Sequence, residues 1–199
     1  MNASPDRGTV SGLYRKISAD LTQYMTHSEH FSDRKTGLLR KVSVLCTPCL
    51  MCCMLYRMSH WLHERGWGGC AQVVALANFV VHKAAINPRS SIGGGLYIPH
   101  PVGVVFDGRA GERLTLFARA TVSGDGMGRG SLDRGAHDRP TLGEDVVVGA
   151  HAVIAGGVAV GDGTIIGANA VLMTGVPSRS TVYTRSRQVV RERWAGDAD

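Results

Sequence analysis

Small and aliphatic residues recur every six positions between residues 86 and 176. This period fits neither a helix, which repeats every 3.6 residues, nor an alternating strand. It predicts a parallel β-solenoid in which each hexad supplies one short strand and one corner, and three hexads complete a triangular coil of about 18 residues. The positions are Ile86, Ile92, Ile98, Val104, Ala110, Leu116 and Val122, and then, in a new register, Leu142, Val148, Ile154, Val160, Ile166 and Leu172.

The fourth residue after most of these positions is also small or apolar, so we expect it to face the core as well. These companions are Ser90, Leu96, Val102, Gly108, Leu114, Ala120, Val146, Ala152, Val158, Thr164, Ala170 and Val176. The competing fold, an ordinary β-sandwich, would show turn signals every eight to twelve residues instead of a strict hexad. The series breaks at residues 123–141, which are rich in glycine and charge, and which we expect to project from one corner as a functional loop.

Glycine is the main departure in composition, with 26 in 199 residues, most of them within residues 86–177. Several directly follow an inward position, for example Gly143, Gly149, Gly161 and Gly167. We interpret these as corner residues whose backbone angles a β-carbon would oppose.

The rest of the chain divides into three further segments. Residues 1–37 are a mixed, polar extension with at most one short helix, and residues 38–85 are an α-helical cap. In the cap, helical spacing over 38–62 ends at Gly66, Gly68 and Gly69, and a second helix over 71–85 stops before Pro88. The β-helix then covers 86–177, with the inserted loop 123–141, and a basic tail covers 178–199.

The cysteines Cys46, Cys49, Cys52 and Cys53 are clustered on apolar sequence, and Cys70 follows. The odd number of five and the lack of a secretory signal favour a reducing, cytoplasmic compartment. The spacing describes one face of a helix, so we expect core packing rather than a metal site, because no second cysteine pair follows.

The net charge of +6 lies outside the solenoid segment, and no basic stripe is interleaved with aromatic residues, which argues against nucleic-acid binding. The most apolar stretch, residues 42–56, is shorter than the ~20 residues that span a bilayer. It is expected to be either a buried helix or one that contacts a membrane surface peripherally.

Three motifs resemble those of the serine acetyltransferase family of hexapeptide-repeat acyltransferases, over residues 38–190. They are L-Y-R-M-S-H-W-L at 55–62, I-N-P-R-S-S-I-G-G-G-L-Y-I-P-H-P-V-G-V-V at 86–105, and D-R-P-T-L-G at 138–143. The resemblance implies a left-handed parallel β-helix with an N-terminal α-helical segment. It also implies a homotrimer or a dimer of trimers, with acetyl-coenzyme A bound between neighbouring solenoids.

His100 is the main catalytic candidate. It stands at the third position of its hexad, which points outward, and it matches the first catalytic histidine of the family. A neutral imidazole, with a pKa of about 6.5, can take the proton from a hydroxyl group as that group attacks the thioester carbonyl. The competing interpretation is an incidental surface histidine.

The chain departs from the family pattern at three positions. The aspartate that orients the catalytic histidine is replaced by Ala85, the aspartate before that histidine by Pro99, and the second histidine by Arg139. His137 and Asp138 are candidate catalytic substitutes, although His137 is equally well explained as a solvated loop residue, and Arg139 is a candidate substrate-binding residue. Loss of both acceptor aspartates favours a sugar hydroxyl of an exopolysaccharide or capsule over serine.

For the donor, the resemblance places coenzyme A beside Ala150 and Ala168, where small side chains leave the backbone accessible. Arg179, Arg185 and Arg187 could bind its phosphates, or could form a solvated basic tail.

The sequence therefore predicts an acetyl-coenzyme A-dependent O-acetyltransferase without a covalent intermediate or a metal, acting on a polysaccharide or small-molecule hydroxyl. Serine O-acetylation, as in cysteine biosynthesis, is the alternative acceptor chemistry. A γ-carbonic-anhydrase-like zinc enzyme using His100, His137 and His151, and a non-catalytic solenoid, are the other classes that we consider.

Overall fold

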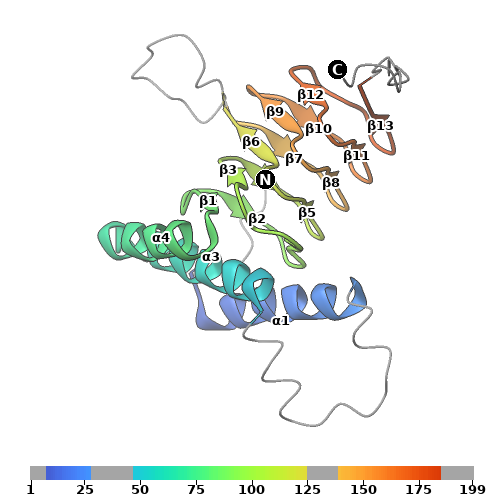
Figure 1. Ribbon diagram of the computed structural model, residues 1–199. Helices are drawn as coiled ribbons and strands as arrows, with labels where there is room; N and C mark the ends of the chain where they lie inside the picture. Colours follow the sequence, from blue (N-terminus) through green and yellow to red (C-terminus); the bar gives the residue numbers. More distant parts are fainter. Residues whose placement is uncertain (1–7, 28–46, 125–138, 185–199) are drawn as a thin grey trace, which may run out of the picture.

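The computed structural model describes residues 8–27, 47–124 and 139–184. Within them, helices α1 (Val10–His27), α3 (Pro48–Glu64) and α4 (Gly68–His82) gather at one end of a stack of short parallel strands (Figure 1). The described part of the segment before residue 38 contains one helix, but α1 is longer than the short helix predicted, with 18 residues, and it packs against α3. Gly68 and Gly69 begin α4 instead of ending a helix, since Gly66, with φ 82°, already makes the left-handed turn after α3.

The strands are two or three residues long and form three parallel sheets. Sheet A has the order β1-β3-β6-β9-β12, sheet B the order β2-β4-β7-β10, and sheet C the order β5-β8-β11-β13. The chain visits A, B and C in turn, so each circuit is one coil, and the predicted parallel solenoid is confirmed. The bounds are β1 Ala85–Ile86, β2 Ser91–Ile92, β3 Val105–Phe106, β4 Arg109–Ala110, β5 Thr115–Leu116, β6 Thr121–Ser123, β7 Thr141–Leu142, β8 Val147–Val148, β9 Val153–Ala155, β10 Ala159–Val160, β11 Ile165–Ile166, β12 Val171–Leu172 and β13 Thr181–Val182.

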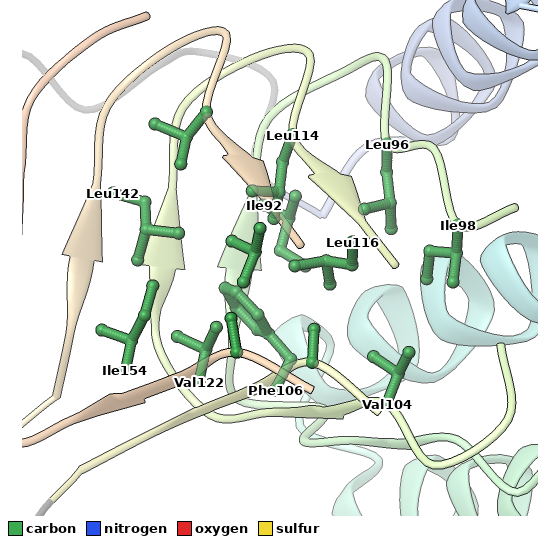
Figure 2. Close-up of a cluster of buried hydrophobic side chains, with 14 of the residues drawn as sticks. Ile92, Leu96, Ile98, Val104, Phe106, Leu114, Leu116, Val122, Leu142 and Ile154 are labelled. Carbon is green, nitrogen blue, oxygen red and sulfur yellow. The ribbon is translucent and has the colours of Figure 1, made fainter. Parts of the chain in front are cut away.

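Most of the predicted inward positions lie in the core (Figure 2). Ile92, Ile98, Leu116, Val122 and Ile154 are completely buried. At the far end, β13 pairs with β11, so the solenoid continues past residue 177, where the basic tail was expected to begin.

The second coil departs from the predicted register. Ile86 pairs with Phe106, 20 residues later, and Phe106 pairs with Val122, 16 residues later. The corner after Ile98 is therefore two residues longer than a regular hexad, and the corner after Phe106 is two residues shorter. Phe106 takes the strand position in the core, Val104 becomes its buried companion, and Val102, predicted to face inward, is 54% exposed.

The glycines that follow inward positions are required for a different reason than the one predicted. Neither Gly93 nor Gly149 has a positive φ. A β-carbon on Gly93 would lie 2.6 Å from the carbonyl carbon of Gly111, and one on Gly149 would lie 2.7 Å from the Ala168 nitrogen. These glycines permit close approach of successive coils, while the left-handed corner angles are taken by residues such as Arg119, His151 and Asn169.

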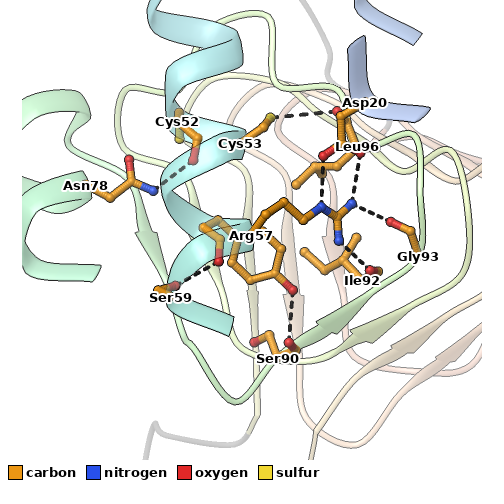
Figure 3. Close-up of polar contacts among 11 residues, drawn as sticks. Asp20, Cys52, Cys53, Arg57, Ser59, Asn78, Ser90, Ile92, Gly93 and Leu96 are labelled. Atoms are coloured by element: carbon orange, nitrogen blue, oxygen red, sulfur yellow. Dashed lines mark hydrogen bonds and ion pairs between the residues drawn. The ribbon is translucent and has the colours of Figure 1, made fainter. Parts of the chain in front are cut away.

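Helix α3 lies across the first coil and satisfies its carbonyl groups (Figure 3). The donors lie on one face of the helix, as spacings of three, four and seven residues require. Cys49 donates to the Pro99 oxygen (2.8 Å), Cys53 to the Leu96 oxygen (3.7 Å) and Tyr56 to the Ser90 oxygen (2.9 Å). Arg57 donates to the Ile92 oxygen (2.6 Å), and His60 Nδ1 donates to the Pro88 oxygen (2.9 Å).

In the described part of the apolar stretch 42–56, Leu50, Cys52, Cys53 and Tyr56 are buried against the first coil, whereas Pro48 and Met51 are exposed. Cys52 and Cys53 are in the core, whereas Cys49 is half-buried and Cys70 is exposed. No helix within residues 8–27, 47–124 and 139–184 is long and apolar enough to cross a membrane.

Candidate active site

His100 lies in the long corner that leads from sheet C to sheet A. Its side chain is exposed, as the outward hexad position predicted. The two neighbouring residues are Pro99 and Pro101, which restrict φ and lack an N–H group. The corner is held by Gly103 N donating to the Lys83 oxygen (2.9 Å) and by Arg119 N donating to the Val102 oxygen (3.0 Å).

Successive corners between sheets C and A stack into a column, which we call the His100 edge (residues 99–104, 117–120, 149–152 and 167–170). Backbone hydrogen bonds connect its members: His151 N donates to the Ala118 oxygen (3.0 Å), and Asn169 N to the Ala150 oxygen (2.9 Å). Ala150 and Ala168 therefore lie on the same edge as His100. With parallel strands 4.7–4.9 Å apart, their corners are about 10 and about 14 Å along the solenoid from the His100 corner.

Arg139 lies on a second column, the Arg139 edge, which comprises the corners between sheets A and B. There, Arg109 N donates to the Pro140 oxygen (2.9 Å) at the base of the inserted loop. Sheet A separates this edge from the His100 edge, so one chain does not bring Arg139 and His100 to the same corner. His137 and Asp138 lie outside the described residues.

Arg139 contacts a carboxylate that the sequence analysis missed. Its Nε lies 3.4 Å from Asp107 Oδ1, an ion pair between partly exposed side chains. Asp107 Oδ1 itself is buried and accepts no hydrogen bond from the described residues. In the sequence, Asp107 directly follows the buried Phe106, but the regular six-residue register placed both residues at the wrong positions of the coil.

The remaining candidates are dispersed. Arg179 lies on the third column, between sheets B and C, where its backbone nitrogen donates to the Asp162 oxygen (2.7 Å). Arg185 and Arg187 lie outside the described residues. His151 is exposed on the His100 edge with a left-handed φ of 59°. No group of three or more histidine, cysteine, aspartate or glutamate side chains that could hold a metal ion occurs in the described part of the chain.

Ala85 and Pro99 both flank the His100 corner. Ala85 opens β1 and donates its N–H to the Val104 oxygen (2.8 Å), and Pro99 accepts the hydrogen bond from Cys49. Burial raises the pKa of the Cys49 thiol, which keeps the thiol protonated as a donor at neutral pH.

Comparison with known proteins supports the fold and the chemistry. Residues 139–173 match the family model for the bacterial transferase hexapeptide (six repeats). Serine acetyltransferase from Helicobacter pylori is 35% identical over 154 residues, which cover 75% of this chain and 86% of that protein. The Mycobacterium tuberculosis enzyme is 32% identical over 149 residues, 74% of this chain and 62% of that protein.

Two solved structures have the same fold. Neisseria gonorrhoeae serine acetyltransferase superposes with a TM-score of 0.75 at 22% identity, covering 94% of this chain and 69% of that one. Entamoeba histolytica serine acetyltransferase 1, in complex with L-cysteine, superposes with a TM-score of 0.74 at 27% identity. The match covers 88% of this chain and 64% of that one.

These matches fit the predicted left-handed β-helix and confirm O-acetyltransferase chemistry on a hydroxyl group. The relatives are serine acetyltransferases, so they favour the alternative acceptor over the sugar that the loss of both aspartates had suggested. The chain belongs to the serine acetyltransferase family of hexapeptide-repeat transferases.

Proposed function

We propose that this protein transfers the acetyl group of acetyl-coenzyme A to the side-chain hydroxyl of serine. The observation that carries the proposal is the 35% identity to the Helicobacter pylori serine acetyltransferase over 86% of that enzyme. The reaction fits an exposed imidazole at a corner whose backbone is restricted by two prolines.

His100 acts as the general base. Its neutral imidazole takes the hydroxyl proton while the hydroxyl oxygen bonds to the thioester carbonyl carbon. The tetrahedral intermediate then collapses, the carbon–sulfur bond breaks, and the leaving thiolate of coenzyme A takes the proton from the imidazolium. The products are O-acetylserine and free coenzyme A, and His100 returns to its neutral form.

Coenzyme A lies along the His100 edge in this proposal. Ala150 and Ala168 are small residues on that edge, so the pantetheine arm can approach the backbone and present its acyl end to His100. Arg185 and Arg187 contribute guanidinium groups for the phosphates, whereas Arg179 lies on the column between sheets B and C and is not part of this edge.

Arg139 and Asp107 recognise the amino-acid part of the acceptor. The guanidinium of Arg139 suits an α-carboxylate, and the partly exposed carboxylate of Asp107 suits an α-ammonium group. Because these residues lie on a different edge from His100, the proposal requires a homotrimer in which the Arg139 edge of one chain faces the His100 edge of the next. His137 and Asp138 belong to the same inserted loop as Arg139.

The test is an acceptor screen that follows release of free coenzyme A with serine, homoserine and sugar polymers side by side. We expect serine to be the best acceptor, and we expect His100→Ala to lose about 10²–10⁴-fold in kcat. His63→Ala, which changes a histidine on α3 away from the edge, is the matched control and retains activity. Full activity of His100→Ala contradicts the mechanism.

A sugar hydroxyl is the second candidate acceptor. Its support is the replacement by Pro99 of the family carboxylate before the catalytic histidine, because a sugar has no ammonium group for such a carboxylate to bind. Turnover of a sugar polymer above that of serine in the same screen would select this candidate.

A further inference from the structure

The peptide group that joins Pro99 to His100 is fixed from outside the solenoid. Its carbonyl oxygen, on Pro99, accepts a hydrogen bond from the Cys49 thiol at 2.8 Å. The peptide unit is planar, so a bond that holds this oxygen also holds the nitrogen of His100.

The neighbouring backbone offers few other hydrogen bonds that could fix the Pro99–His100 peptide plane. Pro99 and Pro101 supply no N–H group, and a residue before proline is restricted to extended conformations, which applies to His100. The main remaining freedom is rotation of the Pro99–His100 peptide plane. That rotation changes φ of His100 and therefore the direction in which its imidazole leaves the corner.

Cys49 is well placed to supply a rigid hydrogen bond. It is the second residue of α3, which begins at Pro48 and is held to the first coil by Arg57 and Tyr56. Its thiol is half-buried and protonated, so it donates to the carbonyl and reacts slowly with oxidants.

We propose that Cys49 is a positioning residue for acetyl transfer: its thiol holds the Pro99–His100 peptide plane and thereby aims the His100 imidazole along the His100 edge. The inference rests on the proposed role of His100 as the base. It assigns a function to Cys49, whose presence core packing does not explain, because Cys49 is only partly buried whereas Cys52 and Cys53 are buried.

The kinetic test compares Cys49→Ala, which removes the donor, with Cys49→Ser, which keeps a hydroxyl donor. Cys53→Ala is the control, because Cys53 lies one turn further along the same helix face and its sulfur is 3.7 Å from the Leu96 oxygen. We expect Cys49→Ala to lower kcat about tenfold with the KM for acetyl-coenzyme A unchanged. Cys49→Ser should restore most of kcat, and Cys53→Ala should lower the Tm and leave kcat unchanged.

A second readout does not depend on the acceptor. The His100 imidazole is followed by NMR pH titration in ¹⁵N-histidine-labelled protein, with its signal assigned by its loss in His100→Ala. We expect its chemical shifts and titration midpoint to move in Cys49→Ala, to return towards wild type in Cys49→Ser, and to stay unchanged in Cys53→Ala.

Wild-type kcat together with an unchanged His100 titration in Cys49→Ala overturns the inference. Equal effects of Cys49→Ala and Cys53→Ala on kcat also overturn it, because they would indicate a general effect on α3. A wild-type protein that releases no coenzyme A with any acceptor contradicts the proposed function, and the titration then decides the positioning role on its own.

Discussion

Asp20 of α1 and Arg57 of α3 form an ion pair whose side chains are 2% and 1% exposed. Arg57 Nε lies 2.8 Å from Asp20 Oδ2, and a terminal guanidinium nitrogen lies 2.9 Å from Oδ1. The same carboxylate accepts the Leu96 N–H at 2.7 Å, and Arg57 also donates to the Ile92 oxygen. The pair therefore joins two helices to the first coil (Figure 3).

Removing one partner leaves a buried charge without compensation. We expect Asp20→Ala to lower the free energy of unfolding by about 3–5 kcal/mol, measured by urea denaturation. The double variant Asp20→Leu/Arg57→Met should recover only part of this loss, because it removes both charges but leaves the Leu96 N–H and the Ile92 carbonyl without these partners. A loss below about 1 kcal/mol in the single variant contradicts this account.

Stability should decrease in mild acid because of His60. Burial lowers the pKa of its imidazole, an effect that Lys16 and Arg57 support and that the Pro88 carbonyl and Glu64 oppose. Between the folded pKa and about 6.5, the unfolded chain binds the proton and the folded chain does not, so the free energy of unfolding falls as the pH falls through this window.

The measurement is the Tm of wild type and His60→Asn at about pH 7.5 and about pH 5.5. Asparagine can still donate to the Pro88 oxygen, which His60 Nδ1 contacts at 2.9 Å, but it does not titrate. We expect a smaller decrease of Tm in the variant. Identical decreases in the two proteins would assign the pH dependence to other groups.

The register of the second coil can be tested with two substitutions. Phe106 is completely buried, so Phe106→Ala should cost about 3–5 kcal/mol in urea unfolding. Val102 is 54% exposed, so Val102→Ala should stay within about 0.5 kcal/mol of wild type. The regular hexad predicts a large loss at Val102 instead.

Two glycines should respond to alanine with opposite signs. Gly149→Ala places a methyl group 2.7 Å from the Ala168 backbone nitrogen, which cannot yield easily, and should destabilise the protein by about 1–3 kcal/mol. Gly69 is the second residue of α4, with nothing within 4 Å of an added β-carbon. Gly69→Ala should stabilise by up to about 1 kcal/mol, because alanine loses less entropy in a helix. Thermal unfolding of both variants is the check.

The sequence was sufficient to predict the solenoid, most of its core and the outward direction of His100, because a six-residue period constrains which positions face inward. It did not reveal the shift at Phe106, since one corner gains two residues and the next loses two. Because the longer corner and the shorter corner cancel, the six-residue series continues past Phe106 without a break. Val104 is buried in either register.

The contacts of α1 and α3 could not be predicted for a different reason. Asp20 lies in a polar segment whose burial depends on an arginine 37 residues later, so local pattern gave no indication of it. The cysteine spacing predicted a helix face towards the core, and Cys52 and Cys53 lie in that core, whereas Cys49 is half-buried and Cys46 lies outside the described residues. That Cys49 reaches the His100 corner follows from how α3 lies across the first coil, which is a tertiary relationship.

The row of donors along α3 also has a consequence for assembly. An exposed β-edge can recruit a strand from another molecule, and solenoids that stack end to end in this way form fibres. At the first coil, carbonyl groups that would accept such a strand are already bonded to side chains of α3. Helix α3 therefore prevents the addition of a strand from another molecule at this end of the solenoid. Variants that weaken the packing of α3 should be examined for fibre formation as well as for activity.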